Sequence, residues 1–293
     1  MPQFDVVRRE ARLTMNDGVE LYRYEWTPAK PVAQILLLHG VAEHALRYEH
    51  VAQFFANNGY RVVAYDQRGH GATGIRQHRG DTSKLGKLGA GGVRRVRRDL
   101  AEMLRLVRGE QPSLPLALVA HSWGSLTTQA LLNEDASLVD AVVLTGTAWR
   151  RIGHMNSGDL NKRHAHLGDT GGEWLTRDDS KVQAWVDDPL AFEARVQQLF
   201  GTVEAAKLLG RPAKGLSADV PMLITSGSDD SLSNPTSLGK LAEDYRKRSG
   251  LSDVTLAIFP GARHEIFNET NRSEVMEFIE QWLASKLLRR SGT

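Results

Sequence analysis

The chain has 293 residues, 41% hydrophobic and 25% charged, a length and composition that suit one globular domain or one domain with an insertion. Its 37 Lys and Arg against 35 Asp and Glu leave a net charge of +2, which indicates neither a nucleic-acid partner nor an anionic membrane. The absence of cysteine excludes disulfides, thiolate metal sites and a cysteine nucleophile.

The N-terminal sequence MPQFDVVRREARL lacks the apolar core of a signal peptide. The longest apolar run, ILLL with its neighbours, is far too short to cross a bilayer. We therefore expect a soluble, cytoplasmic protein without stable membrane insertion.

Short β-type runs then alternate along the chain with longer helix-type runs. The β-type runs are apolar and β-branched without polar alternation, which favours buried parallel strands. Apolar stripes at helical spacing occupy residues 46–59, residues 93–109 and the C-terminal segment from Asn271. This alternation predicts an α/β fold with a doubly wound, mostly parallel sheet. The predicted strands lie within residues 33–39, 60–66, 114–120, 139–146, 219–227 and 253–261.

One long segment interrupts the alternation. Residues 149–214 contain no strand-like run, but they carry Gly-rich and charged pieces followed by helix-like pieces. Because long structureless loops are uncommon in compact domains, we expect a helical cap at 149–214, inserted between core segments 1–148 and 215–293.

Ser122 stands at the junction between a strand-like run and a helix-like run. The pattern small-x-Ser-x-Gly at such a junction predicts a nucleophile elbow, a strained turn that needs small residues two positions before and after the serine. Here those residues are Ala120, where glycine is usual, and Gly124. The alternative is a serine that only caps the following helix.

A base and an acid follow in the chain order that this kind of hydrolase requires, serine, then acid, then histidine. Asp229 and Asp230 follow the predicted strand at 219–227, and His264 follows the next predicted strand. Open α/β sheets build their sites at the carboxyl ends of strands. Three suitable residues at three strand ends therefore favour a catalytic triad over isolated surface residues.

An oxyanion hole is expected where the strand at 33–39 ends in HGVAEH. We assign one backbone donor to Val41, with Gly40 as the alternative, and the second to Trp123, the residue after the serine. The polar residues of this region could also suggest a metal site, but their spacing matches no metal-ligand pattern on a helix, so turn-forming and hydrogen-bonding roles are favoured. These residues are His39, His44, Asp66 and His70.

The motifs LLHGVAEHALRY, VVAYDQRGHGATG, HSWGS, SGSDDSLSNPTSLGKL and FPGARHEIFNE together resemble the monoacylglycerol lipase and lysophospholipase group of α/β-hydrolases, which is serine aminopeptidase-like. The likeness covers nearly the whole chain, and EWLTRDDSKVQAWVDDPLAF resembles the cap of the group's bacterial members.

The resemblance implies a role for each matching residue. Ser122 would be the nucleophile, Asp230 the acid, His264 the base, and Val41 and Trp123 the oxyanion donors. Asp230 is preferred to Asp229 because the group's motif reads Gly-x-x-Asp, counted from Gly227. Contacts with the substrate are expected from Gly40 and from the cap residues Trp149, Trp174 and Trp185.

The sequence thus predicts a serine carboxylic ester hydrolase that cleaves monoacyl esters through an acyl-enzyme, with no cofactor and no metal. The alternatives are a small alkyl or aryl monoester esterase, an aminopeptidase-like hydrolase, and a non-catalytic binding protein of the same fold. The Gly-rich stretch at 86–92 does not follow a strand, so a loop is favoured over a phosphate site. Four arginines at 94, 95, 97 and 98 are expected on a solvated helix face rather than on nucleic acid.

Overall fold

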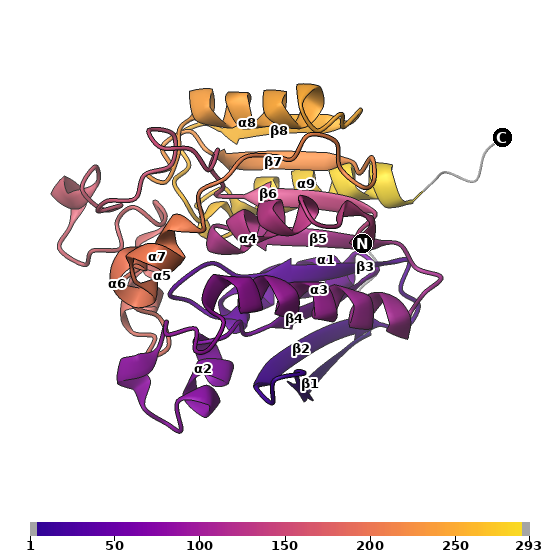
Figure 1. Ribbon diagram of the computed structural model, residues 1–293, viewed down its shortest axis with the longest axis horizontal. Helices are drawn as coiled ribbons and strands as arrows, with labels where there is room; N and C mark the ends of the chain where they lie inside the picture. Colours follow the sequence, from indigo (N-terminus) through magenta and orange to yellow (C-terminus); the bar gives the residue numbers. More distant parts are fainter. Residues whose placement is uncertain (1–4, 289–293) are drawn as a thin grey trace.

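The alternating runs form a single eight-stranded sheet with strand order β1-β2-β4-β3-β5-β6-β7-β8 in the computed structural model, which describes residues 5–288 (Figure 1). The pairs from β4 to β8 are parallel, whereas β1 pairs with β2, and β2 with β4, in antiparallel fashion. The α/β fold predicted from the sequence is confirmed. The strands are β1 (Val6–Thr14), β2 (Glu20–Pro28), β3 (Ala33–Leu38), β4 (Tyr60–Tyr65), β5 (Leu116–His121), β6 (Ala141–Thr145), β7 (Met222–Gly227) and β8 (Val254–Phe259).

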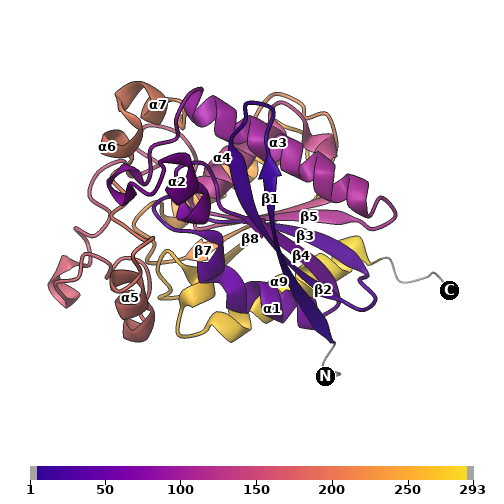
Figure 2. The same ribbon diagram turned by 90° about the horizontal axis from the view of Figure 1, so that it is seen from below.

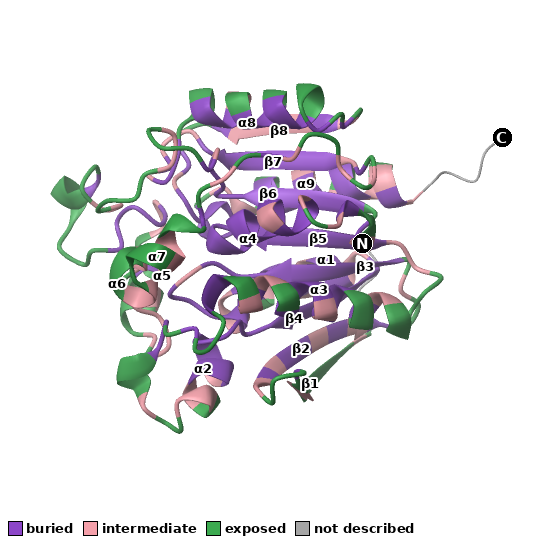
Figure 3. Ribbon diagram, in the orientation of Figure 1, coloured by how far each residue is buried: buried purple, intermediate pink, exposed green. Residues whose placement is uncertain are grey.

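The five central strands β4, β3, β5, β6 and β7 are buried along their whole length (Figure 3). Their apolar, β-branched side chains point alternately into two core layers, one on each face of the sheet. Each Leu or Ile that is fully buried in these layers contributes roughly 2 kcal/mol to folding through the hydrophobic effect.

The helices cover the two faces of the sheet. Helices α3 (Gly92–Glu110), α4 (Trp123–Leu132) and α8 (Pro235–Lys247) pack on one face, and α1 (Glu49–Asn57) and α9 (Arg272–Leu287) pack on the other (Figures 1 and 2). The apolar stripe expected at 93–109 is buried, with Val93, Val96 and Leu100 facing inwards on α3. This arrangement leaves the carboxyl ends of the parallel strands uncovered by core helices.

Residues 149–214 lie across that carboxyl edge, at the left of Figure 1, and we call this segment the cap. Its helices are short: α5 (Asp179–Val186), α6 (Val196–Phe200), α7 (Thr202–Ala206) and the 3₁₀ turn η4 (Ala165–Leu167). The expected helical insertion is therefore largely irregular, because side-chain to backbone hydrogen bonds replace regular helix in its first half. Asn161, for example, accepts from the Trp174 N–H at 3.0 Å and donates to Glu173 at 2.6 Å.

A further short helix, α2 (Gly71–Gln77), follows β4, and 3₁₀ turns lie at η1 (Ala45–Tyr48), η2 (Thr82–Lys84), η3 (Ala136–Leu138) and η5 (Ile266–Asn268). No helix among residues 5–288 combines the length and the apolar composition that crossing a bilayer would require.

Candidate active site

Ser122 occupies a strained turn between β5 and α4. Its φ of +49° lies in the left-handed region, where residues other than glycine are uncommon. The turn is held because the Ser122 N–H donates to the Thr145 carbonyl at 2.9 Å. Gly124 is required next to it, since a Cβ there would lie 2.6 Å from the His39 carbonyl oxygen. Ala120, the departure from glycine, is fully buried in the core, where its methyl group is accommodated.

The structure brings Ser122, His264 and Asp230 into one hydrogen-bonded row. The Ser122 Oγ lies 2.8 Å from His264 Nε2, and His264 Nδ1 lies 2.9 Å from Asp230 Oδ1. A carboxylate can only accept, so Nδ1 carries the proton and Nε2 is free to accept the serine proton. All three side chains are at least nine-tenths buried. The geometry is that of a nucleophile, a base and an orienting acid.

The two adjacent aspartates, either of which could be the acid, face different parts of the molecule. Asp230 also accepts from Ser226 Oγ at 2.6 Å and from the Leu232 N–H at 2.8 Å, so its oxygens are fixed. Asp229 instead lies 2.9 Å from Nε2 of the cap residue His164 and forms an ion pair with Arg163. Asp229 therefore joins the core to the cap.

The protonation of His264 is governed by two opposing effects. Burial penalises the imidazolium, but the charge of Asp230 and the hydrogen bond to it outweigh burial and raise the pKa of His264 above 6.5. A base with a raised pKa accepts a proton more readily, provided that the pH is high enough to keep it neutral at rest.

The two amides expected to form the oxyanion hole are free. The N–H groups of Val41 and Trp123 have no acceptor among residues 5–288, and both residues line the pocket that contains Ser122. The alternative donor, Gly40, is occupied because its N–H donates to the buried Glu43 carboxylate. The local geometry thus favours Val41 over Gly40.

The histidines and the aspartate weighed as metal ligands have other partners. His39 Nδ1 donates to the Gly40 carbonyl at 2.7 Å, and its Nε2 accepts from the Gln67 N–H at 2.9 Å. Asp66 accepts from the Ala45 and Ala72 N–H groups at 2.9 and 2.8 Å. Burial lowers the pKa of His70 to about 4, and its Nδ1 donates to a carbonyl at 2.8 Å. These residues organise the loops that carry the oxyanion donors.

A buried charged cluster beside Ser122 was missed by sequence reasoning. Glu43 accepts from Tyr48 at 2.9 Å, and Arg47 lies 2.8 Å from Glu265. Burial and the neighbouring charge of Glu265 raise the pKa of Glu43 above 4.5. The signal was present in the motif HGVAEHALRY, where charged residues stand directly after a buried strand, but the motif does not say which way they point.

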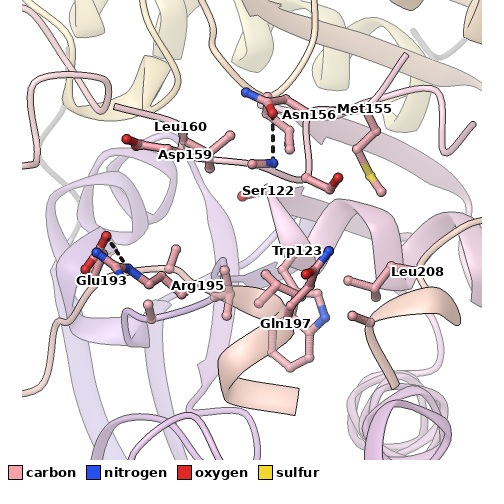
Figure 4. Close-up of a pocket in the computed structure, with 18 of the residues that line it drawn as sticks. Ser122, Trp123, Met155, Asn156, Asp159, Leu160, Glu193, Arg195, Gln197 and Leu208 are labelled. Atoms are coloured by element: carbon pink, nitrogen blue, oxygen red, sulfur yellow. Dashed lines mark hydrogen bonds and ion pairs between the residues drawn. The ribbon is translucent and has the colours of Figure 1, made fainter. Parts of the chain in front are cut away.

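A pocket of about 690 Å³ connects Ser122 to the cap (Figure 4). Glu43, His121 and Glu265 line it close to Ser122, and a Cβ built on Gly40 would touch Glu43, Ser122 and His121 together. Polar cap residues such as Asn156, Glu193 and Gln197 form part of the wall. Apolar residues from both core and cap form another part, namely Leu126, Met155, Leu160, Val196, Leu208 and Leu232.

The three tryptophans expected to contact the substrate lie in different places. Trp174 and Trp185 line the pocket, and the Trp174 ring lies 4.7 Å from the His264 ring. The expectation for Trp149 is wrong, because it does not line the pocket and its Nε1 donates to Asp244 on α8 at 2.8 Å. A tryptophan that begins the cap can satisfy its N–H on the core surface, and sequence pattern does not distinguish the two directions. Gly40, also expected at the substrate, is not among the lining residues.

The remaining sequence features have structural partners. In the Gly-rich stretch, Lys87 Nζ donates to the carbonyls of Gln198 and Leu199, which end the cap helix α6. Arg95 and Arg97 form ion pairs with Asp99 and Glu134, at 3.1 and 2.6 Å, while Arg94 and Arg98 are exposed. Through Lys87, the stretch at 86–92 therefore binds the cap.

Comparison with known proteins places this geometry in a family. The profile described as serine aminopeptidase, S33 matches residues 29–271. A monoacylglycerol lipase from Mycolicibacterium smegmatis is 29% identical over 92% of this chain and 95% of its own, and human monoglyceride lipase is 26% identical over 92% and 88%.

Solved structures agree on the fold. A thermostable carboxyl esterase from Bacillus coagulans in complex with glycerol matches with a TM-score of 0.80 and 21% identity, covering 96% of this chain and 99% of that one. A soluble variant of monoglyceride lipase from Saccharomyces cerevisiae in complex with a substrate analog matches with a TM-score of 0.75 and 20% identity, covering 96% and 95%.

Proposed function

The chain belongs to the serine aminopeptidase S33 family of α/β-hydrolases, and on that premise we propose that it is a serine ester hydrolase that acts on monoacyl esters of the monoacylglycerol or lysophospholipid type. The curated relatives named above are lipases of monoacylglycerols, which supports this substrate class. The proposed mechanism requires no cofactor. The cytoplasmic location and the lack of a nucleic-acid partner stay predictions from the sequence.

In the proposed reaction, Ser122 Oγ attacks the ester carbonyl while its proton passes to His264 Nε2, 2.8 Å away. Asp230 holds the imidazole in the required tautomer and stabilises the imidazolium. The N–H groups of Val41 and Trp123 stabilise the negative oxygen of the tetrahedral intermediate. His264 then returns the proton to the leaving alcohol, and an acyl-enzyme on Ser122 remains. Water, activated by His264, hydrolyses it and restores the serine.

The pocket is the observation that carries the substrate assignment. Its wall carries a set of apolar residues from core and cap among polar cap residues, and Glu43, His121 and Glu265 offer hydrogen-bonding groups close to Ser122. A monoacyl ester has the matching chemistry, with an apolar acyl chain on one side of the ester bond and a hydroxylated leaving group on the other. Each acyl methylene buried in the wall gains roughly 0.8 kcal/mol, so binding favours chains long enough to fill it.

An aminopeptidase-like activity is the second candidate, because carboxylates close to the serine could bind a substrate ammonium. Their existing partners weigh against it. Glu265 is bound to Arg47 at 2.8 Å, and Glu43 accepts from Tyr48 and from the Gly40 N–H. A free ammonium would have to compete with partners already in place.

The proposal is tested by a chain-length series of p-nitrophenyl esters, measured below any micelle-forming concentration, together with 1-monoacylglycerols and triacylglycerols. We expect kcat/KM to rise with acyl length until the pocket is full, and monoacylglycerols to be cleaved in preference to triacylglycerols. A maximum at two carbons with a steady fall to twelve would favour the small-ester alternative. Faster cleavage of amino-acid p-nitroanilides than of any ester would favour the aminopeptidase.

A further inference from the structure

The loop that carries the proposed oxyanion donor is bonded to the cap as well as to the core. We call residues 40–44 the oxyanion loop. The backbone N–H of Phe192 donates to the Ala42 carbonyl at 3.0 Å, and Nε2 of His44 donates to Oδ2 of Asp188 at 2.7 Å. Both cap partners belong to one short segment, 188–192, so a single piece of the cap contacts the loop twice.

The middle of the oxyanion loop adopts a conformation that needs outside support. Ala42 has a φ of +64° and is buried, although an L residue rarely populates the left-handed region. Such a conformation persists only where its surroundings fix it. Ala42 directly follows Val41, so a change in the turn at Ala42 would also displace the Val41 backbone.

The core supports this stretch mainly through side chains. Within the loop the Glu43 carboxylate accepts from the Gly40 N–H and from Tyr48 of the core at 2.9 Å, and just after the loop Asp66 accepts from the Ala45 N–H at 2.9 Å. The carbonyl of the strained residue Ala42 accepts its hydrogen bond from the cap. The core and the cap therefore divide the support of the loop between them.

The segment 188–192 is itself fixed by internal hydrogen bonds and by packing on the core. Oδ1 of Asp188 accepts from the Leu190 N–H at 2.9 Å, which fixes the turn that follows it. The Phe192 ring stacks on His70 at 5.9 Å between centroids, and His70 is fully buried in the core. Val41 also packs against the apolar cluster that contains Trp123 and the cap residue Leu208.

We propose that Asp188 is a positioning residue for the oxyanion hole: through His44, and through the segment that it starts, it holds the oxyanion loop so that the Val41 N–H points at the reacting oxygen. The cap thus contributes to transition-state stabilisation in addition to enclosing the substrate. The inference rests on the proposed function, since it assumes that Val41 is an oxyanion donor.

The expected loss of kcat can be scaled to the contribution of a single oxyanion donor. Complete removal of one oxyanion donor lowers kcat by about 10² to 10³. Loss of one of two cap contacts displaces the donor only in part, so we expect Asp188→Ala to lower kcat about 5- to 30-fold. KM should change less than twofold, because the ground-state ester gains little from a donor aimed at the oxyanion.

The experiment compares Asp188→Ala, Asp188→Asn, His44→Ala and the double variant of Asp188→Ala with His44→Ala on a short soluble ester. Asp187→Ala is the matched control, since Asp187 is adjacent and its side chain, within residues 5–288, accepts only from the exposed Gln183 at 2.8 Å. Affinity for a trifluoromethyl ketone, which forms a tetrahedral oxyanion on the serine, is measured for each. We expect its inhibition constant to rise by the same factor as kcat falls. Asp188→Asn keeps one oxygen acceptor and replaces the other with an NH₂ donor, so its kcat should fall less than that of Asp188→Ala.

Three results from the single variants would overturn the proposal. They are a kcat of Asp188→Ala equal to that of Asp187→Ala, a rise in KM with kcat unchanged, and a loss in Asp188→Asn as large as in Asp188→Ala. In the double variant, a loss equal to the product of the single losses would also contradict it, because one shared contact cannot be lost twice. Should Asp188→Ala not fold, His44→Ala removes the same contact from the core side and decides the question. Failure of the proposed function is distinct, since the parent enzyme would then lack Ser122-dependent esterase activity.

Discussion

The sheet and the cap place residues around the same serine by different means. In the sheet, Ser122, Asp230 and His264 follow the carboxyl ends of β5, β7 and β8, which are held by backbone ladders, so the positions of these residues follow from the fold. In the cap, short helices and loops are held by side-chain bonds to the core, such as His164 to Asp229 and Lys87 to the end of α6. Under the proposed function, the core would carry out the reaction, and the cap would select the substrate and help to position the oxyanion loop.

The largest expected effect lies in the core. Ser122→Ala should lower kcat by about 10⁴ to 10⁶, because the triad acts as a unit and only binding and oxyanion stabilisation survive. The melting temperature should hardly change, which a thermal scan checks. If the purified variant retained more than a few per cent of the esterase activity, Ser122 would not be the nucleophile.

Variants of the neighbouring residues Asp230 and Asp229 allow the core and the cap to be compared directly. Asp230→Asn should lower kcat by about 10³ to 10⁴, since the imidazole loses the acceptor that fixes its tautomer. Asp229→Asn removes a charge that faces His164 and Arg163, and should lower kcat less than tenfold. Steady-state kinetics of the two variants, measured at one pH, give the ranking. The reverse ranking would move the acid to Asp229.

The pH dependence of kcat/KM reports on the core base. Because the pKa of His264 is raised above 6.5, the group is protonated and inactive below that pKa and becomes a competent base as the pH rises through it. Activity should therefore fall about tenfold for each pH unit on the acid side of an inflection above 6.5. A profile whose acid limb inflects below 6 would contradict the Asp230–His264 pairing.

The smallest effect concerns the cap wall. Leu208 is buried, lines the pocket and comes from the end of the cap. Leu208→Ala removes apolar surface from the pocket wall, so kcat/KM for a dodecanoyl ester should fall about tenfold, in line with a loss of 1 to 3 kcal/mol. Because Leu208 also packs in the cluster that contains Trp123, the acetyl ester should lose some activity as well, but less than the dodecanoyl ester. An equal loss on both esters would mean that Leu208 supports the fold and not the substrate.

The features that could be predicted from the sequence lie mostly in the sheet core, and those that could not lie mostly outside it. The parallel strands are runs of buried apolar residues, and the triad stands at their ends, so both were visible in the pattern. The hairpin β1–β2 was not, because VVRREARLT alternates charges along a mostly exposed edge strand. The direction of Trp149 and the pairing of His44 with Asp188 could not be predicted, because each depends on a contact between residues 95 and 144 positions apart, with a cap residue outside regular structure as one partner.

The central claim is that ester cleavage proceeds through an acyl-enzyme on Ser122. It is tested most directly by quenching the enzyme in acid soon after mixing with a p-nitrophenyl ester of a medium-chain acid, and mapping the modified peptide by mass spectrometry. The account predicts an added acyl group on Ser122, formed in a burst with one equivalent of p-nitrophenol, and its absence in Ser122→Ala. Turnover of the ester without an acylated Ser122, or acylation of another residue at the same rate, would contradict it.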